Sequence, residues 1–126
     1  FESQILGVTI PANNSVMLGS MSGSKLGIWV AHGEGRFNLP ESMDKYNVVA
    51  KYSYSAYPGN PNGSKASVAG IASADGRHRA MMPHLERAIF PWQCGFYPAT
   101  RRNDEVTPWI DAFVNARRWI EEKTKA

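Results

Sequence analysis

The distribution of apolar positions along the chain predicts a strand-rich domain. Short apolar runs cover residues 5–10, 26–31, 48–52, 68–73 and 79–82, and a Gly, Pro, Asn, Asp or Ser lies within three positions of each end. Runs of this length with this punctuation are typical of β-strands. Run 26–31 is apolar on both faces, so we expect it to lie in the centre of a sheet.

Turn and capping residues indicate how these strands connect and where helices form. Asp75-Gly76 separates two strand-like runs, which predicts a hairpin made of residues 68–73 and 79–82. Thr107-Pro108 is a good helix start, because Thr caps the first turn and Pro fits the first helical position. An apolar stripe at helical spacing follows, so we predict a C-terminal helix at 108–122. Shorter helical pieces are expected at 16–18 and 40–45.

Composition narrows the class of protein. A chain of 126 residues with 43% hydrophobic and 20% charged residues is expected to form one globular domain. No apolar run approaches the roughly 20 residues that a membrane helix needs. The net charge is +3, and the basic residues of the last quarter are mixed with acidic ones, which does not favour a nucleic-acid partner. The single cysteine, Cys94, excludes an internal disulfide and suits a reducing, cytosolic compartment.

The strongest candidate for chemistry follows the run 79–82. Pro83 ends that strand, because proline cannot donate to a ladder, and His84 then stands at the start of a loop with Glu86 two residues later. A carboxylate beside an imidazole can fix its tautomer and stabilise its protonated form. His84 and Glu86 therefore fit two members of a nucleophile–base–orienter triad. An ordinary surface pair is the alternative.

Other candidate groups have simpler interpretations. His32 and Glu34, set between glycines, could bind an anion or a metal, but a turn that contains a capping histidine is favoured because two ligands do not make a zinc site. Cys94 could act as a nucleophile only if it folds against His84, and a packed thiol is favoured. His78 is expected to face solvent. The turn-rich segment 57–64 lacks the pattern of a Walker-type phosphate loop.

Three motifs together resemble a known family. They are residues 32–37 (HGEGRF), 60–64 (NPNGS) and 81–87 (MMPHLER). In this order and at about this spacing they are similar to the end of phosphoribosylformylglycinamidine synthases, the glutamine-dependent enzymes of the fourth step of purine synthesis. The resemblance covers essentially the whole chain. Residues 108–117 are similar to the tail of the large, single-polypeptide type.

This resemblance implies a fold and a set of roles. The fold would be α/β, the C-terminal half of a class I glutamine amidotransferase domain (flavodoxin-like, triad-hydrolase), with a mixed sheet, a hairpin and a C-terminal helix. His84 would be the catalytic base and Glu86 would orient it. The parent enzyme would use glutamine, ATP and Mg²⁺ in the cytoplasm, and this fragment itself would bind no cofactor, nucleic acid or membrane.

Two departures from the family pattern shape the expectations. Leu85 stands where the family usually has Pro. The nucleophile elbow lies upstream of Phe1 in such enzymes, so residues 1–126 are expected to form a partial domain that hydrolyses no glutamine alone. The rest of the parent polypeptide would supply the synthetase domain and the nucleophile-bearing half. An exposed apolar face and self-association are expected in consequence.

The residues leave two alternatives open. The chain could belong to the separate small glutaminase subunit, which shares the three motifs but less of the ending. It could also be a non-catalytic interaction module that shares the fold. Two further roles stay open, that of His32 and that of the loop from Asn60 to Ser64. Either could line a path toward the synthetase or shape a turn.

Overall fold

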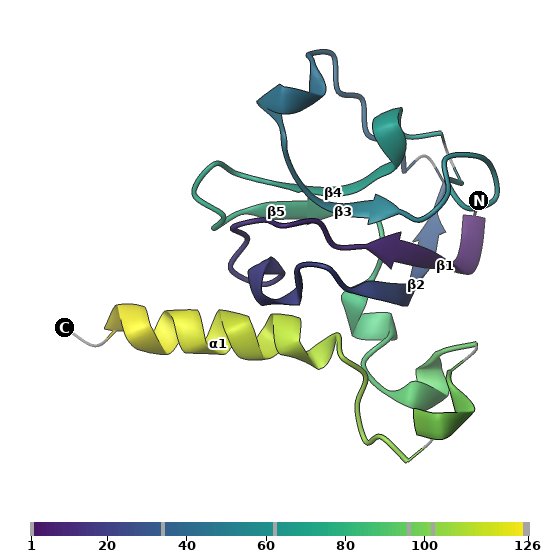
Figure 1. Ribbon diagram of the computed structural model, residues 1–126, viewed down its shortest axis with the longest axis vertical. Helices are drawn as coiled ribbons and strands as arrows, with labels where there is room; N and C mark the ends of the chain where they lie inside the picture. Colours follow the sequence, from purple (N-terminus) through teal and green to yellow (C-terminus); the bar gives the residue numbers. More distant parts are fainter. Residues whose placement is uncertain (1, 34, 62, 96, 102, 125–126) are drawn as a thin grey trace.

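The chain forms one curled antiparallel sheet with a long helix at the C-terminus (Figure 1). The computed structural model describes residues 2–33, 35–61, 63–95, 97–101 and 103–124. The elements are β1 (Glu2–Thr9), β2 (Lys25–His32), β3 (Asn47–Tyr52), β4 (Val68–Ala72), β5 (Arg79–Met81) and α1 (Ile110–Thr124). The strand order is β2-β1-β3-β4-β5. The predicted strands and C-terminal helix are confirmed, and α1 starts two residues later than expected.

The predicted mixed sheet is wrong, because each described strand pair is antiparallel. Parallel neighbours need a crossover connection of a dozen or more residues, usually a helix. Here α1 comes after the last strand, so it cannot serve as a crossover. The hairpin of β4 and β5 is confirmed, and Gly76 adopts a φ of +75° in its turn.

The placement of β2 also corrects the expectation that it is central. It is an edge strand in the sheet order, and its apolar character has another cause. Segments from the C-terminal third cover it: the Trp29 indole donates to the carbonyl of Gln93 at 2.7 Å, and the Trp109 indole donates to the carbonyl of Gly27 at 2.9 Å. A strand that is covered by later segments is buried without two neighbouring strands.

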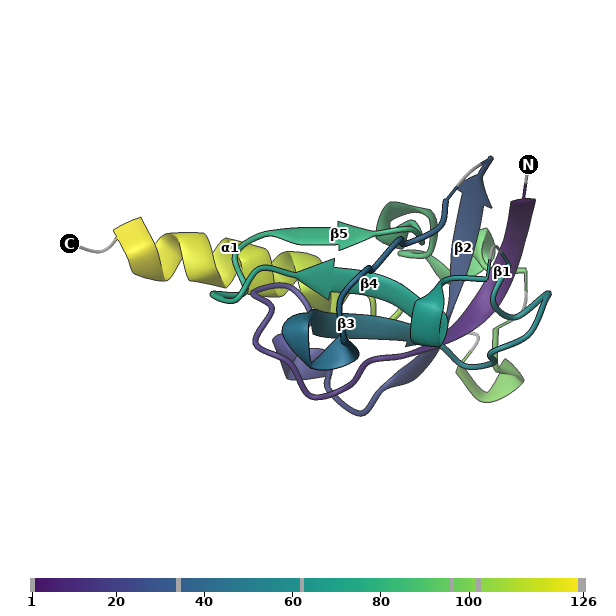
Figure 2. The same ribbon diagram turned by 90° about the horizontal axis from the view of Figure 1, so that it is seen from above.

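The sheet curls so that its two ends meet. β1 and β3 share only the pairs Val8–Tyr52 and Thr9–Lys51, and Figure 2 shows β1 and β2 crossing the direction of β3 to β5. Beyond β5, the amide of His84 donates to the carbonyl of Trp29 in β2 at 2.8 Å, as an isolated antiparallel bridge. The candidate base therefore sits at the seam that closes the curl.

The core fills the inside of this curl. It is made of alternating positions of β1 and β2 with residues of β3, β4 and the connecting segments, chiefly Val8, Ile10, Leu18, Ile28, Val30, Val49 and Val68. Trp109 and Ala112 bring the start of α1 into the same core, and the Asn115 amide donates to the carbonyl of Met17 at 3.0 Å. The far half of α1 extends past the sheet (Figure 1), and Ile120 there is 56% exposed.

The smaller predicted pieces occur as turns and 3₁₀ helices. Residues 16–18 form a turn that leads into a 3₁₀ helix at Gly19–Met21, and the expected helix at 40–45 is a 3₁₀ helix at Met43–Lys45. Within the described residues, α1 and every other helix are too short or too polar to span a membrane.

Candidate active site

The loop that carries the candidate base is anchored on both sides. β5 ends at Met81, and the amide of Met82 still donates to the carbonyl of Ala69 at 3.0 Å. His84 is extended, with φ −109° and ψ 103°, and it precedes a 3₁₀ helix at Leu85–Arg87. The Leu85 side chain is 3% exposed and lies in the core. The loop is therefore held by a backbone bond before it turns and by a buried side chain after it.

The structure brings His84 and Glu86 together, as the sequence predicts. Their Nδ1 and Oε1 atoms lie 2.7 Å apart, which is hydrogen-bond distance. The His84 side chain is 33% exposed and that of Glu86 is 63% exposed, so the carboxylate lies on the solvent side. The pair lines a pocket of about 320 Å³ between the β5 end and α1. The geometry of a base with its orienter is therefore present, and the roles themselves stay predictions.

The charge of Glu86 determines which way the hydrogen bond runs. Burial alone would raise the pKa of Glu86, but the hydrogen bond from His84, a backbone N–H and the charges of His84 and Arg87 hold it below its usual value. An ionised carboxylate only accepts hydrogen bonds, so Nδ1 of His84 must carry the proton. When the ring is neutral, Nε2 therefore holds the lone pair, which is the arrangement of a general base.

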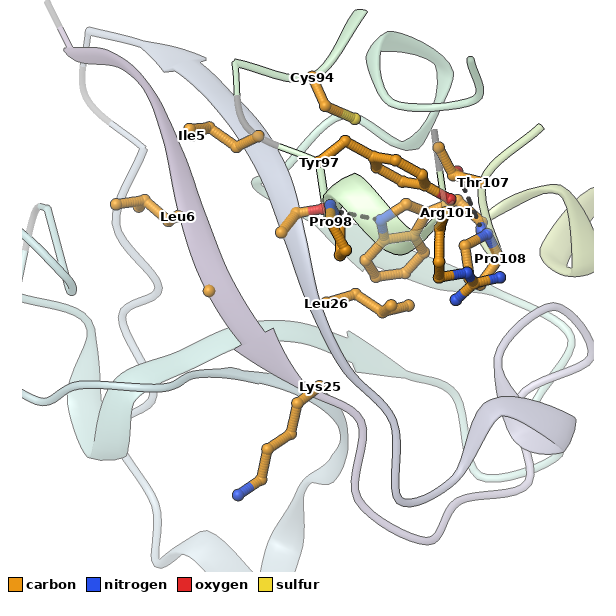
Figure 3. Close-up of a pocket in the computed structure, with 13 residues that line it drawn as sticks. Ile5, Leu6, Lys25, Leu26, Cys94, Tyr97, Pro98, Arg101, Thr107 and Pro108 are labelled. Atoms are coloured by element: carbon orange, nitrogen blue, oxygen red, sulfur yellow. Dashed lines mark hydrogen bonds between the residues drawn. The ribbon is translucent and has the colours of Figure 1, made fainter. Parts of the chain in front are cut away.

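Cys94 does not line the pocket of His84 and Glu86. It lines a larger pocket of about 440 Å³ between β1, β2 and the segment 94–109, where Figure 3 shows it with Tyr97 and Arg101. Burial raises the pKa of Cys94, which disfavours the thiolate. Its sulfur lies 3.9 Å from the carbonyl oxygen of Phe90. This placement favours the packed thiol over a nucleophile that acts with His84.

The comparisons with known proteins decide the family. Residues 1–120 match the family described as the CobB/CobQ-like glutamine amidotransferase domain. The chain belongs to this family. It is 42% identical over 135 residues to a probable phosphoribosylformylglycinamidine synthase, chloroplastic/mitochondrial, of Arabidopsis thaliana, a match that covers 96% of this chain. It is 40% identical over 134 residues to the phosphoribosylformylglycinamidine synthase of Homo sapiens, which covers 97% of this chain.

These relatives are much longer than the chain, which spans about a tenth of their length: 10% of each. The solved structure of PurLQS from Thermotoga maritima is similar in fold, with a TM-score of 0.68 at 23% identity. That match covers 94% of this chain and 48% of the other. The α/β amidotransferase fold class is therefore confirmed, with the correction to the strand directions given above.

The described part of the motif at 32–37 packs against the loop that carries His84. A Cβ atom on Gly35 would lie 2.5 Å from Cγ of the His32 ring and 2.9 Å from Sδ of Met82. Only glycine allows the backbone to pass that closely. His32 is half-buried at the end of β2, so its ring helps to seat this loop. Glu34, its suggested partner in binding an ion, lies outside the described residues.

The loop from Asn60 to Ser64 is tied to the same motif. The buried Asn60 side chain donates to the carbonyl of Ser64 at 3.0 Å and accepts from its amide at 3.1 Å. The Ser64 hydroxyl in turn accepts from the amide of Phe37 at 3.3 Å. Asn62 lies outside the described residues. For the described part of this loop, these bonds support the turn-shaping interpretation.

The remaining candidates add no second site. His78 is exposed, as expected. Among the residues that the structure describes, no group of three or more His, Cys, Asp or Glu side chains is placed to hold a metal ion. Sequence reasoning missed Arg79, which lines the same pocket as His84 and Glu86. Its alternation with Met81 along β5 was the available signal, because both residues share one face of the strand.

Proposed function

We propose that this chain supplies the His84 base and the Glu86 orienter of the glutaminase reaction in a phosphoribosylformylglycinamidine synthase. The observation that carries the proposal is the 2.7 Å contact between Nδ1 of His84 and Oε1 of Glu86 on a loop anchored at the seam of the sheet. The relatives at 40–42% identity, which are named for this enzyme, point to the same reaction.

The proposed chemistry splits the cleavage of an amide into two steps. A cysteine thiolate attacks the carboxamide carbon of glutamine, and the protonated His84 gives its Nε2 proton to the leaving nitrogen, so ammonia departs and a thioester remains. The neutral imidazole then takes a proton from water as its oxygen attacks the thioester. Glutamate leaves and the thiolate is restored. Glu86 holds the ring in position and stabilises the imidazolium in both steps.

The nucleophile is proposed to come from outside residues 1–126. Cys94 lies in another pocket and burial disfavours its thiolate, so it does not fit this role. The chain would then form part of an amidotransferase domain, with the nucleophile-bearing half and the synthetase domain as its partners in the cytoplasm. On this account the 126-residue chain hydrolyses no glutamine by itself.

The freed ammonia would be used in an ATP-driven amidation of formylglycinamide ribonucleotide. ATP and Mg²⁺ would act at the synthetase part of such an enzyme. The described residues do not fit a site for them, because they bring no metal-ligating cluster together and the segment 57–64 lacks a phosphate-loop pattern. The proposed role of this chain is in the release of ammonia.

The test compares two nitrogen donors in the complete natural polypeptide that contains this chain. His84→Ala removes the base, so we expect the glutamine-dependent rate to fall by about 10²–10⁴-fold while the rate with added ammonia stays unchanged. His78→Ala is the matched control, because His78 is exposed and outside the pocket. Equal loss with both donors, or no loss with glutamine, would contradict the proposal.

A further inference from the structure

The side-chain amide of Gln93 lies between the loop of His84 and the segment that follows it. Its Oε1 atom accepts from the amides of Ile89 at 3.0 Å and Phe90 at 2.9 Å, and its Nε2 atom donates to the carbonyl of Glu86 at 3.4 Å. Two N–H donors at one end require an oxygen there, which places the NH₂ group at the Glu86 carbonyl. One side chain therefore joins three backbone groups.

These bonds take the place of one more helical turn. The short 3₁₀ helix after the candidate base ends with a bond from the amide of Ala88 to the carbonyl of Leu85 at 3.0 Å. The next bond of such a helix would join the amide of Ile89 to the carbonyl of Glu86. Gln93 accepts from the first of these two groups and donates to the second, so its amide inserts between them and ends the helix.

Trp29 holds both ends of this unit. Its backbone carbonyl accepts from the amide of His84 at 2.8 Å, and its indole N–H donates to the carbonyl of Gln93 at 2.7 Å. The contacts thus form a closed circuit that runs from Trp29 to His84, along the loop to Glu86, across to Gln93 and back to Trp29. Because Trp29 belongs to the paired strand β2, the backbone of the candidate base and that of its orienter are fixed to the same support.

The direction of the Glu86 carboxylate depends on this backbone. Its side chain is 63% exposed, so packing restricts it little, and Oε1 lies 2.7 Å from Nδ1 of His84. A long side chain loses rotamer freedom when it is held in one place. A fixed backbone that already directs the carboxylate at the ring lowers this cost, so the contact forms more readily.

We propose that Gln93 is a positioning residue for the pair of His84 and Glu86. By fixing the Glu86 carbonyl, it keeps the carboxylate within hydrogen-bond distance of Nδ1, and Nε2 of the neutral ring stays free of a proton. The residue acts on the ring through Glu86 and not by a contact of its own. Its catalytic meaning rests on the proposed function, whereas the positioning is a property of the folded chain.

The first test is a long-range ¹H–¹⁵N NMR spectrum of the neutral His84 ring in this chain. Gln93→Met keeps the length of the side chain but removes the amide, so we expect the ratio of Nδ1-protonated to Nε2-protonated ring to fall about 2–10-fold, as for the loss of one ordinary hydrogen bond. Gln4→Met is the matched control, because the Gln4 amide donates to the carbonyl of Pro58 instead. The inference is overturned if the ratio changes no more in Gln93→Met than in Gln4→Met.

A second variant separates positioning from stability. Gln93→Glu keeps an oxygen for the amides of Ile89 and Phe90 but has no N–H for the Glu86 carbonyl. We expect a free energy of unfolding close to that of the unmutated chain, together with a fall in the ratio of the two neutral ring forms. This variant also replaces Gln93→Met if that one does not fold. An unchanged ratio in Gln93→Glu would mean that Gln93 only shapes the chain, and would overturn the inference.

The kinetic test uses the complete natural polypeptide that contains this chain. Gln93→Met is expected to lower kcat with glutamine about 10–10²-fold, as for a displaced catalytic group, while KM for glutamine and the rate with added ammonia stay unchanged. An unchanged kcat in Gln93→Met, with activity lost in His84→Ala, would remove the catalytic meaning of the positioning.

The two proposals can fail separately. Full glutamine-dependent activity in His84→Ala would remove the proposed function and leave the NMR result for Gln93 standing. Loss of that activity in His84→Ala, with an unchanged His84 spectrum in the Gln93 variants, would remove only the role of Gln93.

Discussion

At the scale of single residues, the sequence predicted the contact that matters most. His84 and Glu86 are two positions apart on a loop that follows a strand ended by proline. Because they are so close in sequence, their side chains can reach each other in most conformations of the loop. The contact of Arg79 with Met17 could not be predicted in the same way. These residues are 62 positions apart, and only the packing of the segment before β2 against β5 brings them together.

The close approach at Gly35 gives a prediction about stability. A Cβ atom there would overlap the His32 ring and the Met82 sulfur, so Gly35→Ala is expected to cost about 1–3 kcal/mol in the free energy of unfolding. Gly95→Ala is the control, because its nearest contact would be an ordinary one, 3.8 Å from Cγ2 of Ile5. Urea denaturation of both variants measures the difference. Equal free energies of unfolding for the two variants would contradict the close contact of Gly35 with His32 and Met82.

At the scale of elements, apolar runs and caps located the strands and the helix, but not their neighbours. The β2 run was expected to be central because it is apolar on both faces, and it proved to be an edge strand covered by Trp109 and the segment around Gln93. An apolar run in the sequence predicts that a strand is buried, but it does not show whether other strands or other segments cover that strand. For the same reason the strand directions could not be derived from it.

The indole of Trp109 connects the start of α1 to β2 by a hydrogen bond. Trp109 is 1% exposed, and its Nε1 donates to the carbonyl of Gly27. Trp109→Phe removes that donor and leaves the carbonyl unpaired, so we expect a loss of about 1–3 kcal/mol in thermal or urea unfolding. Trp92→Phe, at a position that is 80% exposed, should change stability by less than about 0.5 kcal/mol. Similar losses in both variants would argue against this connection.

At the scale of the whole molecule, the curl of the sheet places the loop of His84 where the two ends of the sheet meet. This arrangement depends on the isolated bridge between Trp29 and His84 and on the short pairing of β1 with β3. No pattern in the sequence predicts either pairing. The family resemblance could supply the overall fold class, because it rests on three motifs rather than on local propensity. It could not supply the position of Arg79 in the pocket of His84 and Glu86, because those motifs do not contain this residue.

Several large apolar side chains are exposed on the molecule. Among the residues that the structure describes, the most exposed of these are Tyr54, Tyr57, Trp92 and Ile120, each more than half exposed. We expect the chain to self-associate as its concentration rises, because burying such groups lowers the free energy. Light scattering over a concentration series measures this, with Ile120→Glu as the variant expected to weaken association. A constant monomer mass throughout would contradict it.

The proposed role of His84 depends on Glu86 holding the imidazole with its proton on Nδ1. The most direct measurement is a long-range ¹H–¹⁵N NMR spectrum of His84 in this chain, recorded at a pH where the ring is neutral. The account predicts a protonated Nδ1 and a bare Nε2, and a weaker preference in Glu86→Gln, whose amide can both donate and accept. A neutral ring that carries its proton on Nε2 would contradict it.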